Sequence, residues 1–321
     1  MGVAMFRALI VVMGCSLALD GAVAFGTINS LGQSAEHEKI TRLGLRGLGF
    51  GPKSLSELAG KTGTFGAVGA PDRPDRGLLT NAAAHCDGGD TLAVPGYPQS
   101  AAQAAAKLAA CKAWIVRFLN RAVRDAGGLL DAGGGIRSSQ IPTYFSCTYN
   151  GSKGRAKCNV FEALGLAFHA GQDFYSHTNW TDIAASGPSG PDNPPGLGQT
   201  KPAPWLDPGK KSRFPDGLIS GCFGGIPERL FCKDAQGRPR VRHSVLNKDK
   251  GAITVGSGRY GPGRTERGKQ NNNFARAAKA AVLDTRHKWM YFERRVRAKY
   301  GKAKGSRILC ALKRDDADGC R

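Results

Sequence analysis

The feature that most constrains the fold is a helix-forming segment, residues 160–180, in which three polar side chains recur at a fixed interval. His169, Asp173 and His177 are four residues apart, and residues with this spacing lie on one face of an α-helix. Two imidazoles and one carboxylate therefore share a ridge roughly 12 Å long. Zinc binds such side chains, so the ridge indicates a cluster of metal ions around Asp173, although a polar helix face that meets solvent would show the same spacing.

The rest of the pattern predicts a mainly α fold with long loops. Residues 101–126 and 274–300 are Ala-rich with apolar side chains at helical spacing, and each predicts a long helix. Residues 34–47 predict a short helix. The segments rich in Gly, Pro, Arg or Asn are expected to be irregular or loops, and these are residues 48–100, 185–216 and 256–273. The loop at 256–273 is expected to be flexible. Strand signals are few.

The first 24 residues have the pattern of a signal peptide. Arg7 provides a positive start, residues 8–19 are apolar, and residues 22–24 (Ala-Val-Ala) fit a cleavage site. Cleavage there would make Phe25 the new N-terminus. A lipoprotein acylated at Cys15 is the weaker alternative, because the preceding residues are a poor match to an acylation site. We therefore expect a secreted or periplasmic protein.

The cysteines agree with export, because eight of the nine lie outside the predicted signal peptide. These eight are Cys86, Cys111, Cys147, Cys158, Cys222, Cys232, Cys310 and Cys320. Their number allows about 105 pairings, so sequence alone leaves the connectivity open. Short spacings favour Cys147–Cys158, Cys222–Cys232 and Cys310–Cys320, and Cys86–Cys111 then remains.

The formal charge of +21 is concentrated in the C-terminal part of the chain. Residues 201–321 contain 29 Lys and Arg against 11 Asp and Glu, a net charge of +18. Such a basic half can attract an anionic membrane surface or nucleic acid, but a solvated surface would have the same composition.

The residues around the ridge, 167–180 (AFHAGQDFYSHTNW), resemble the core motif of the zinc-dependent phospholipase C and P1-type nuclease superfamily. The likeness is greater to the branch that contains the fungal Het-C proteins and related bacterial secreted proteins. The resemblance implies a single multi-helix domain over residues 25–321. An insertion relative to that family, residues 185–240, would form a loop region.

The same resemblance implies further ligands for two or three Zn²⁺ ions. In that superfamily the free N-terminal residue and an early histidine bind one ion, which points to Phe25 and His37 here. An aspartate and a histidine follow, and Asp72 and His85 fit these positions. Asp75, Asp87 and Asp90 are rivals for the place of Asp72.

The last ion of the superfamily uses a later histidine and an acidic residue. His243 fits the histidine position, but Asn247 stands where the family has glutamate, and Asp249 is the candidate replacement. His287, between two basic residues, is interpreted as a surface or packing histidine.

The resemblance implies hydrolysis of phosphodiesters, with Asp72 and Asp173 as the catalytic carboxylates and phospholipid headgroups as the substrate. A nuclease of the same fold is the first alternative, and a non-catalytic secreted toxin or interaction protein stabilised by zinc is the second. We expect a monomer.

Overall fold

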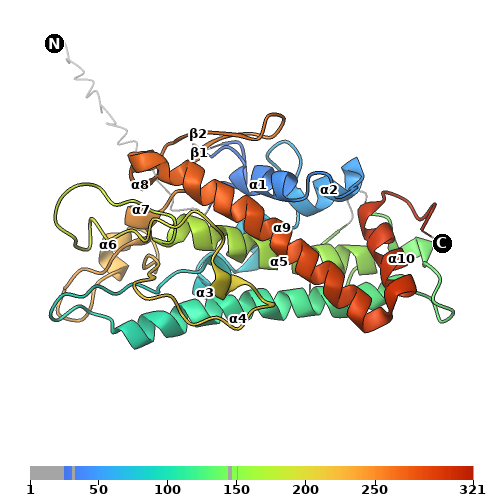
Figure 1. The fold of residues 1–321 in the computed structure, drawn as a ribbon, viewed down its shortest axis with the longest axis horizontal. Coiled ribbons are helices and arrows are strands. Elements are labelled where there is room, and N and C mark those ends of the chain that lie inside the picture. The colour runs from blue at the N-terminus through green and yellow to red at the C-terminus, as the bar shows by residue number, and fades with distance from the viewer. Residues whose placement is uncertain (1–24, 31–32, 144–146, 150, 321) are drawn as a thin grey trace, which may run out of the picture.

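Three long helices run side by side along the longest axis of the molecule (Figure 1). They are α4 (Ala101–Asp125), α5 (Ala156–His177) and α9 (Asn273–Tyr300). α5 packs against both α4 and α9 and is the central helix of the bundle. The protein is seen here in a computed structural model that describes residues 25–30, 33–143, 147–149 and 151–320. The predicted signal peptide lies outside these residues.

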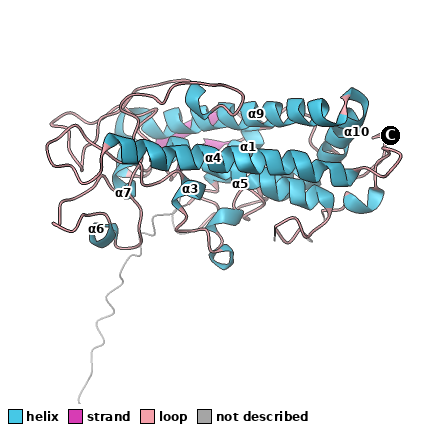
Figure 2. Cartoon of the chain, turned by 90° about the horizontal axis from the view of Figure 1, so that it is seen from below, coloured by secondary structure: helices cyan, strands magenta, loops and turns pink. Residues whose placement is uncertain are grey.

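Shorter elements cover the long helices. The remaining α-helices are α1 (Glu36–Gly44), α2 (Pro52–Ala59), α3 (Ala82–His85), α6 (Glu228–Phe231), α7 (His243–Leu246), α8 (Glu266–Lys269) and α10 (Lys302–Lys313). Short 3-10 turns are η1 (Ala70–Asp72), η2 (Pro74–Arg76), η3 (Ala126–Leu129), η4 (Ser138–Gln140), η5 (Pro204–Leu206) and η6 (Gln270–Asn272). Loops gather at the end that carries α6 and α7, and α10 lies at the opposite end (Figure 2). The fold is mainly α, as predicted.

α4 forms where the sequence predicts it, for local reasons. Ser100 and Gln103 form a reciprocal cap at its start: the Ser100 hydroxyl accepts from the Gln103 amide at 3.3 Å, and the Gln103 side chain accepts from the Ser100 amide at 2.9 Å. Its apolar stripe, which includes Leu108, Ile115 and Leu119, is fully buried. Helical spacing of apolar residues and a cap are sufficient to specify such an amphipathic helix, which has one buried and one exposed face.

α5 differs from α4 because it is enclosed on every side. All of its residues except Asn159 are buried. A helix covered all round must provide a partner for each polar side chain, since a buried unpaired polar group costs about 1–3 kcal/mol. Glu162 meets this need through ion pairs with Arg76 and Arg121. On the predicted ridge, His169 pairs with Asp173, and His177 pairs with Asp87 and Asp249 from other parts of the chain.

Two regions differ from the sequence prediction. Residues 52–59, inside a segment expected to be irregular, form α2, which begins with a proline at a position that favours helix starts. The segment 256–273, expected to be a loop, contains β2 (Arg259–Gly263) and α8. β2 pairs antiparallel with β1 (Gly251–Thr254), and the Thr265 side chain caps α8. The pairing of β2 with β1 is a tertiary contact, so the Gly and Asn content of the segment could not indicate it.

All four predicted disulfides are present, and they are Cys86–Cys111, Cys147–Cys158, Cys222–Cys232 and Cys310–Cys320. Such a set indicates an oxidising compartment. Within the described part of the chain, no helix combines the length and the apolar character needed to cross a membrane.

Candidate metal centre

The predicted metal ligands converge although they come from distant parts of the chain. α5 contributes the ridge, and α1, η1, α3 and α7 bring the others against it. The residues so gathered are His37, Asp72, His85, His169, Asp173, His177, His243 and Asp249. Each is at most 6 % exposed. Five histidines and several carboxylates in an enclosed space form a donor set suited to metal ions.

Asp173 lies at the centre and points its two carboxylate oxygens at different histidines. Its Oδ1 is 3.2 Å from Nε2 of His37. Its Oδ2 is 2.9 Å from Nδ1 of His85 and 3.0 Å from Nε2 of His169. One carboxylate therefore faces two sets of nitrogen donors, which is the arrangement of a carboxylate that can bridge two ions.

Three groups of side chains have the spacing of metal ligands. We call His37, His169 and Asp173 the first group, Asp72, His85 and His169 the second group, and Asp87, His177 and His243 the third group. Within each group the ligand atoms lie within 4.8 Å of one another. The first and second groups share His169, so they are neighbours. The described residues thus include three buried groups that can hold metal ions.

Buried atoms without hydrogen-bond partners support this interpretation. Both carboxylate oxygens of Asp72, Oδ1 of Asp173, Nε2 of His37 and Nε2 of His177 have none among the described residues. Leaving so many buried polar atoms unpaired is costly, because each loses its contact with water. Metal ions held by these groups would give such atoms a partner.

The histidine rings are oriented by contacts on their far sides. Nδ1 of His169 is 2.9 Å from the Val68 carbonyl oxygen, and Nε2 of His85 is 3.1 Å from the Leu78 carbonyl oxygen. Nδ1 of His37 is 2.6 Å from the Gln172 side-chain oxygen. A nitrogen that donates to such an acceptor leaves the other nitrogen of the ring free to bind a metal. Each of these three rings presents that other nitrogen to Asp173.

Gly165 makes one of these contacts possible. It lies one helical turn before His169, and a Cβ at Gly165 would be 2.2 Å from the Ala67 carbonyl oxygen. The absence of a side chain lets residues 67–68 approach α5 closely enough for the Val68 carbonyl to reach the His169 ring. A glycine is also required at 221, where a Cβ would be 2.3 Å from the His243 Cα atom.

Asp87 belongs to the third group, although the sequence indicated it only as an alternative to Asp72. Its Oδ1 is 3.2 Å from Nδ1 of His177 and 3.1 Å from Nδ1 of His243. The sequence feature that could have identified Asp87 as a ligand is its position two residues after His85. Asp75 is exposed and pairs instead with half-buried Arg73, so it is not part of the cluster.

Asp249 contacts the same two histidines as Asp87, from the other side of their rings. Its Oδ1 is 3.2 Å from Nε2 of His177, and its Oδ2 is 3.3 Å from Nε2 of His243. The Ser176 hydroxyl donates to Asp249 and accepts from the Lys248 amide at 3.1 Å. Ser176 thus positions Asp249, which contacts both histidines of the third group.

The electrostatics of the cluster favour ionised carboxylates. Burial raises the pKa of Asp173, but the charges of His169, His177 and His37 outweigh burial and lower it well below the usual range. Burial likewise opposes the charge of His243, yet Asp87 and Asp249 raise the pKa of this ring to about 9. The Asp173 carboxylate therefore stays anionic at neutral pH, as metal binding requires, and the His243 ring must release its proton before it binds an ion.

Phe25 lies beside the cluster. It is fully buried, and its ring contacts the His37 ring edge-on with centroids 5.9 Å apart. The next amide, that of Gly26, donates to the Asp249 carbonyl oxygen at 3.2 Å. The predicted cleavage that would free the Phe25 amine falls at residues outside the described part. His287 is exposed on α9, as interpreted from sequence.

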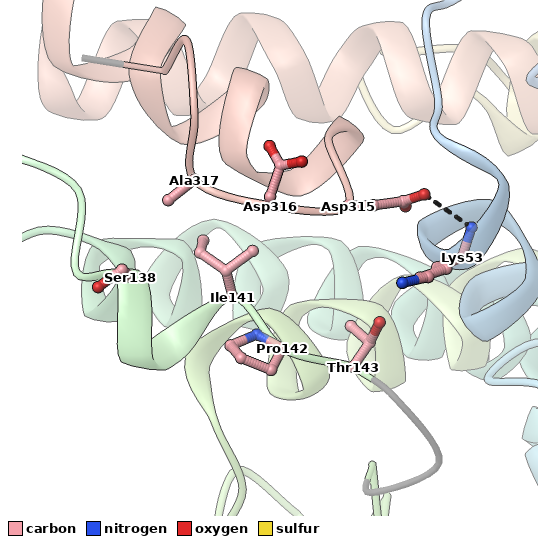
Figure 3. A pocket seen from close by; sticks show the side chains of 8 residues that line it. All are labelled: Lys53, Ser138, Ile141, Pro142, Thr143, Asp315, Asp316 and Ala317. Carbon is pink, nitrogen blue, oxygen red and sulfur yellow. Dashed lines mark hydrogen bonds between the residues drawn. The ribbon is translucent and has the colours of Figure 1, made fainter.

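A cavity of about 310 Å³ lies away from this cluster (Figure 3). It is lined by Lys53, Ser138, Ile141, Pro142, Thr143, Asp315, Asp316 and Ala317, and the Lys53 amide donates to Asp315 across it at 3.1 Å. None of these side chains belongs to the three groups, so the cavity is not part of the metal centre.

Comparison with known family models, curated proteins and solved structures found no match. The conclusions about the site therefore depend on its own geometry.

Proposed function

We propose that the chain is an exported zinc-dependent phosphodiester hydrolase that acts on phospholipid headgroups. The observation that carries this proposal is the placement of Asp173, whose two oxygens face His37 on one side and His85 with His169 on the other. Imidazole and carboxylate donors suit zinc, and neighbouring metal sites that share a ligand are the common arrangement for phosphodiester cleavage.

The residues present fit this role. The side chains of the first and second groups would hold two neighbouring ions, and the one free nitrogen of His169 would serve one of the two. When bound, zinc polarises a phosphoryl oxygen and promotes ionisation of a water molecule. Asp72 would contribute Oδ1 on the side of His169, at 3.5 Å from its Nε2, and its Oδ2 would accept a proton or hydrogen bond from the attacking water. Asp72 and His85 are the most exposed residues of the first and second groups, at 6 % and 5 %, but both carboxylate oxygens of Asp72 are buried.

A second candidate is a non-catalytic exported protein that uses zinc for stability. Near-complete burial of the cluster favours it, because His37, His169, Asp173 and His177 have no exposed surface. A structural zinc site is closed to solvent, whereas a catalytic site keeps a position open. The two candidates differ in one measurable respect, which is turnover by the zinc-loaded protein.

The test uses the full exported chain loaded with zinc. Release of phosphocholine from phosphatidylcholine vesicles would support the proposal if a chelator abolishes it and zinc restores it. Asp72→Asn should then lower kcat by about 100-fold or more. The matched control is Asp75→Asn, three residues away and exposed, which should keep full activity. Cleavage of single-stranded DNA but not of lipid would favour the nuclease alternative. Zinc binding without either activity would overturn the catalytic proposal.

A further inference from the structure

The loop closed by the Cys222–Cys232 disulfide presents an apolar surface to solvent. Ile226, Leu230 and Phe231 are 49 %, 59 % and 52 % exposed. Scattered single apolar side chains are normal on protein surfaces, but three within six residues form a patch that needs a partner. We call these three residues the apolar prong.

The prong is held in place by contacts on both sides. The Glu228 carboxylate accepts from the Ser244 amide at 2.9 Å and from the Ser244 hydroxyl at 2.7 Å. The Cys222 amide donates to Val241 and the His243 amide donates to Cys222, both at 2.8 Å. These bonds and the disulfide fix α6 to the segment that carries His243. The exposed apolar side chains are therefore displayed by an anchored loop, which lowers the entropy lost on binding.

Positive charge surrounds the prong. A cavity of about 270 Å³ beside it is lined by Asp192, Arg229, Cys232, Lys233, Gly237, Pro239 and Arg242. Asp192 pairs with Arg242 at 2.8 Å. Arg229 and Lys233 are exposed and have no ion-pair partner among the described residues. A membrane surface has an anionic headgroup layer above its acyl chains. The two unpaired cations match the headgroups, and the three apolar side chains match the acyl chains.

We propose that α6 and its disulfide loop dock the protein on anionic phospholipid membranes. The prong enters the acyl region, and Arg229 and Lys233 contact lipid phosphates. α6 lies at the loop-rich end of the bundle, opposite α10 (Figures 1 and 2). The Phe223 ring, which belongs to this loop, has its centroid 5.6 Å from that of the His243 ring, so docking would bring lipid beside the third group. The docking surface does not depend on catalysis by that cluster.

The experiment measures binding of the full zinc-loaded chain to vesicles of phosphatidylserine and phosphatidylcholine by sedimentation. Wild type should bind these vesicles and bind pure phosphatidylcholine much more weakly. Leu230→Gln/Phe231→Gln should lower the affinity about tenfold or more. Arg229→Gln/Lys233→Gln should lower it about 25-fold and reduce its salt dependence. The matched control is Leu283→Gln/Met290→Gln on α9, where the two side chains are 37 % and 42 % exposed.

Several results would overturn the proposal. They are equal binding of wild type to both vesicle types, equal binding by the prong variant, or a control variant that loses as much affinity as the prong variant. If the prong variant instead turns a dimer into a monomer in analytical ultracentrifugation while vesicle binding is unchanged, the patch is a contact between two copies. Lipid hydrolysis is assayed in the same samples, so loss of docking and absence of catalysis are seen separately.

Discussion

Replacing Gly165 with alanine tests whether the backbone around α5 determines metal affinity. The added Cβ would lie 2.2 Å from the Ala67 carbonyl oxygen, whereas ordinary contact begins at 3.4 Å. Residues 67–68 must therefore move by about 1 Å, since a carbon atom cannot approach so closely without severe repulsion. The Val68 carbonyl, now 2.9 Å from Nδ1 of His169, would move beyond hydrogen-bond distance.

Two effects of different size follow from this displacement. Loss of the contact that orients a metal-binding histidine lowers metal affinity by about 10- to 100-fold. Overpacking beside a central helix costs about 1–3 kcal/mol in the free energy of unfolding. For a chain of this length that cost corresponds to a Tm lower by roughly 2–6 °C.

Zinc affinity is measured by competition with a chromophoric chelator, and folding is checked by circular dichroism. The matched control is Gly305→Ala, where the new Cβ would be 2.8 Å from the Arg297 Cα atom, between α9 and α10. Both variants should have a lower Tm, but only Gly165→Ala should lose zinc affinity. If Gly165→Ala folds and binds zinc as tightly as wild type, the Val68 contact does not orient His169 and the reasoning is wrong.

Three further predictions concern other charged groups. Zinc at about 100 times its dissociation constant should stabilise wild type by about 2.7 kcal/mol per site, and Asp173→Asn should lose most of the resulting rise in Tm because the two oxygens of this carboxylate face histidines of both the first and the second group. Asp87→Asn should lower the zinc content found by elemental analysis by about one ion per chain, because Asp87 belongs to the third group alone. Burial lowers the pKa of Lys157 to about 8, so the unfolded chain binds a proton between pH 8 and 10 that the folded chain has released. Wild type should therefore gain about 2–3 kcal/mol over Lys157→Met in chemical denaturation between these pH values.

Each of these predictions can fail clearly. An equal zinc response in Asp173→Asn would show that this residue is not shared between sites. An unchanged zinc content in Asp87→Asn would leave Asp249 as the carboxylate of the third group. A stability difference that stays constant from pH 8 to 10 would show that Lys157 titrates normally.

Local patterns were enough to predict the long helices and the three short disulfide loops. The spacing of Leu108, Ile115 and Leu119 is a property of neighbouring residues, so it can be seen without a fold. The three short disulfide loops are likewise local, since a chain of 10 or 11 residues brings its ends together easily. The ridge on α5 follows from the same four-residue interval.

Tertiary structure decided what that ridge does. Sequence spacing could not show that α5 is covered on all sides, because burial depends on α4 and α9, which come from distant parts of the chain. Sequence spacing also did not identify Asp87, because this residue reaches His177 and His243 only after the chain turns at the end of α3. The sequence by itself determined which side chains share a helix face. Only packing determined that Asp173 turns each oxygen to a different histidine, because long-range contacts set the position of His37 and His85.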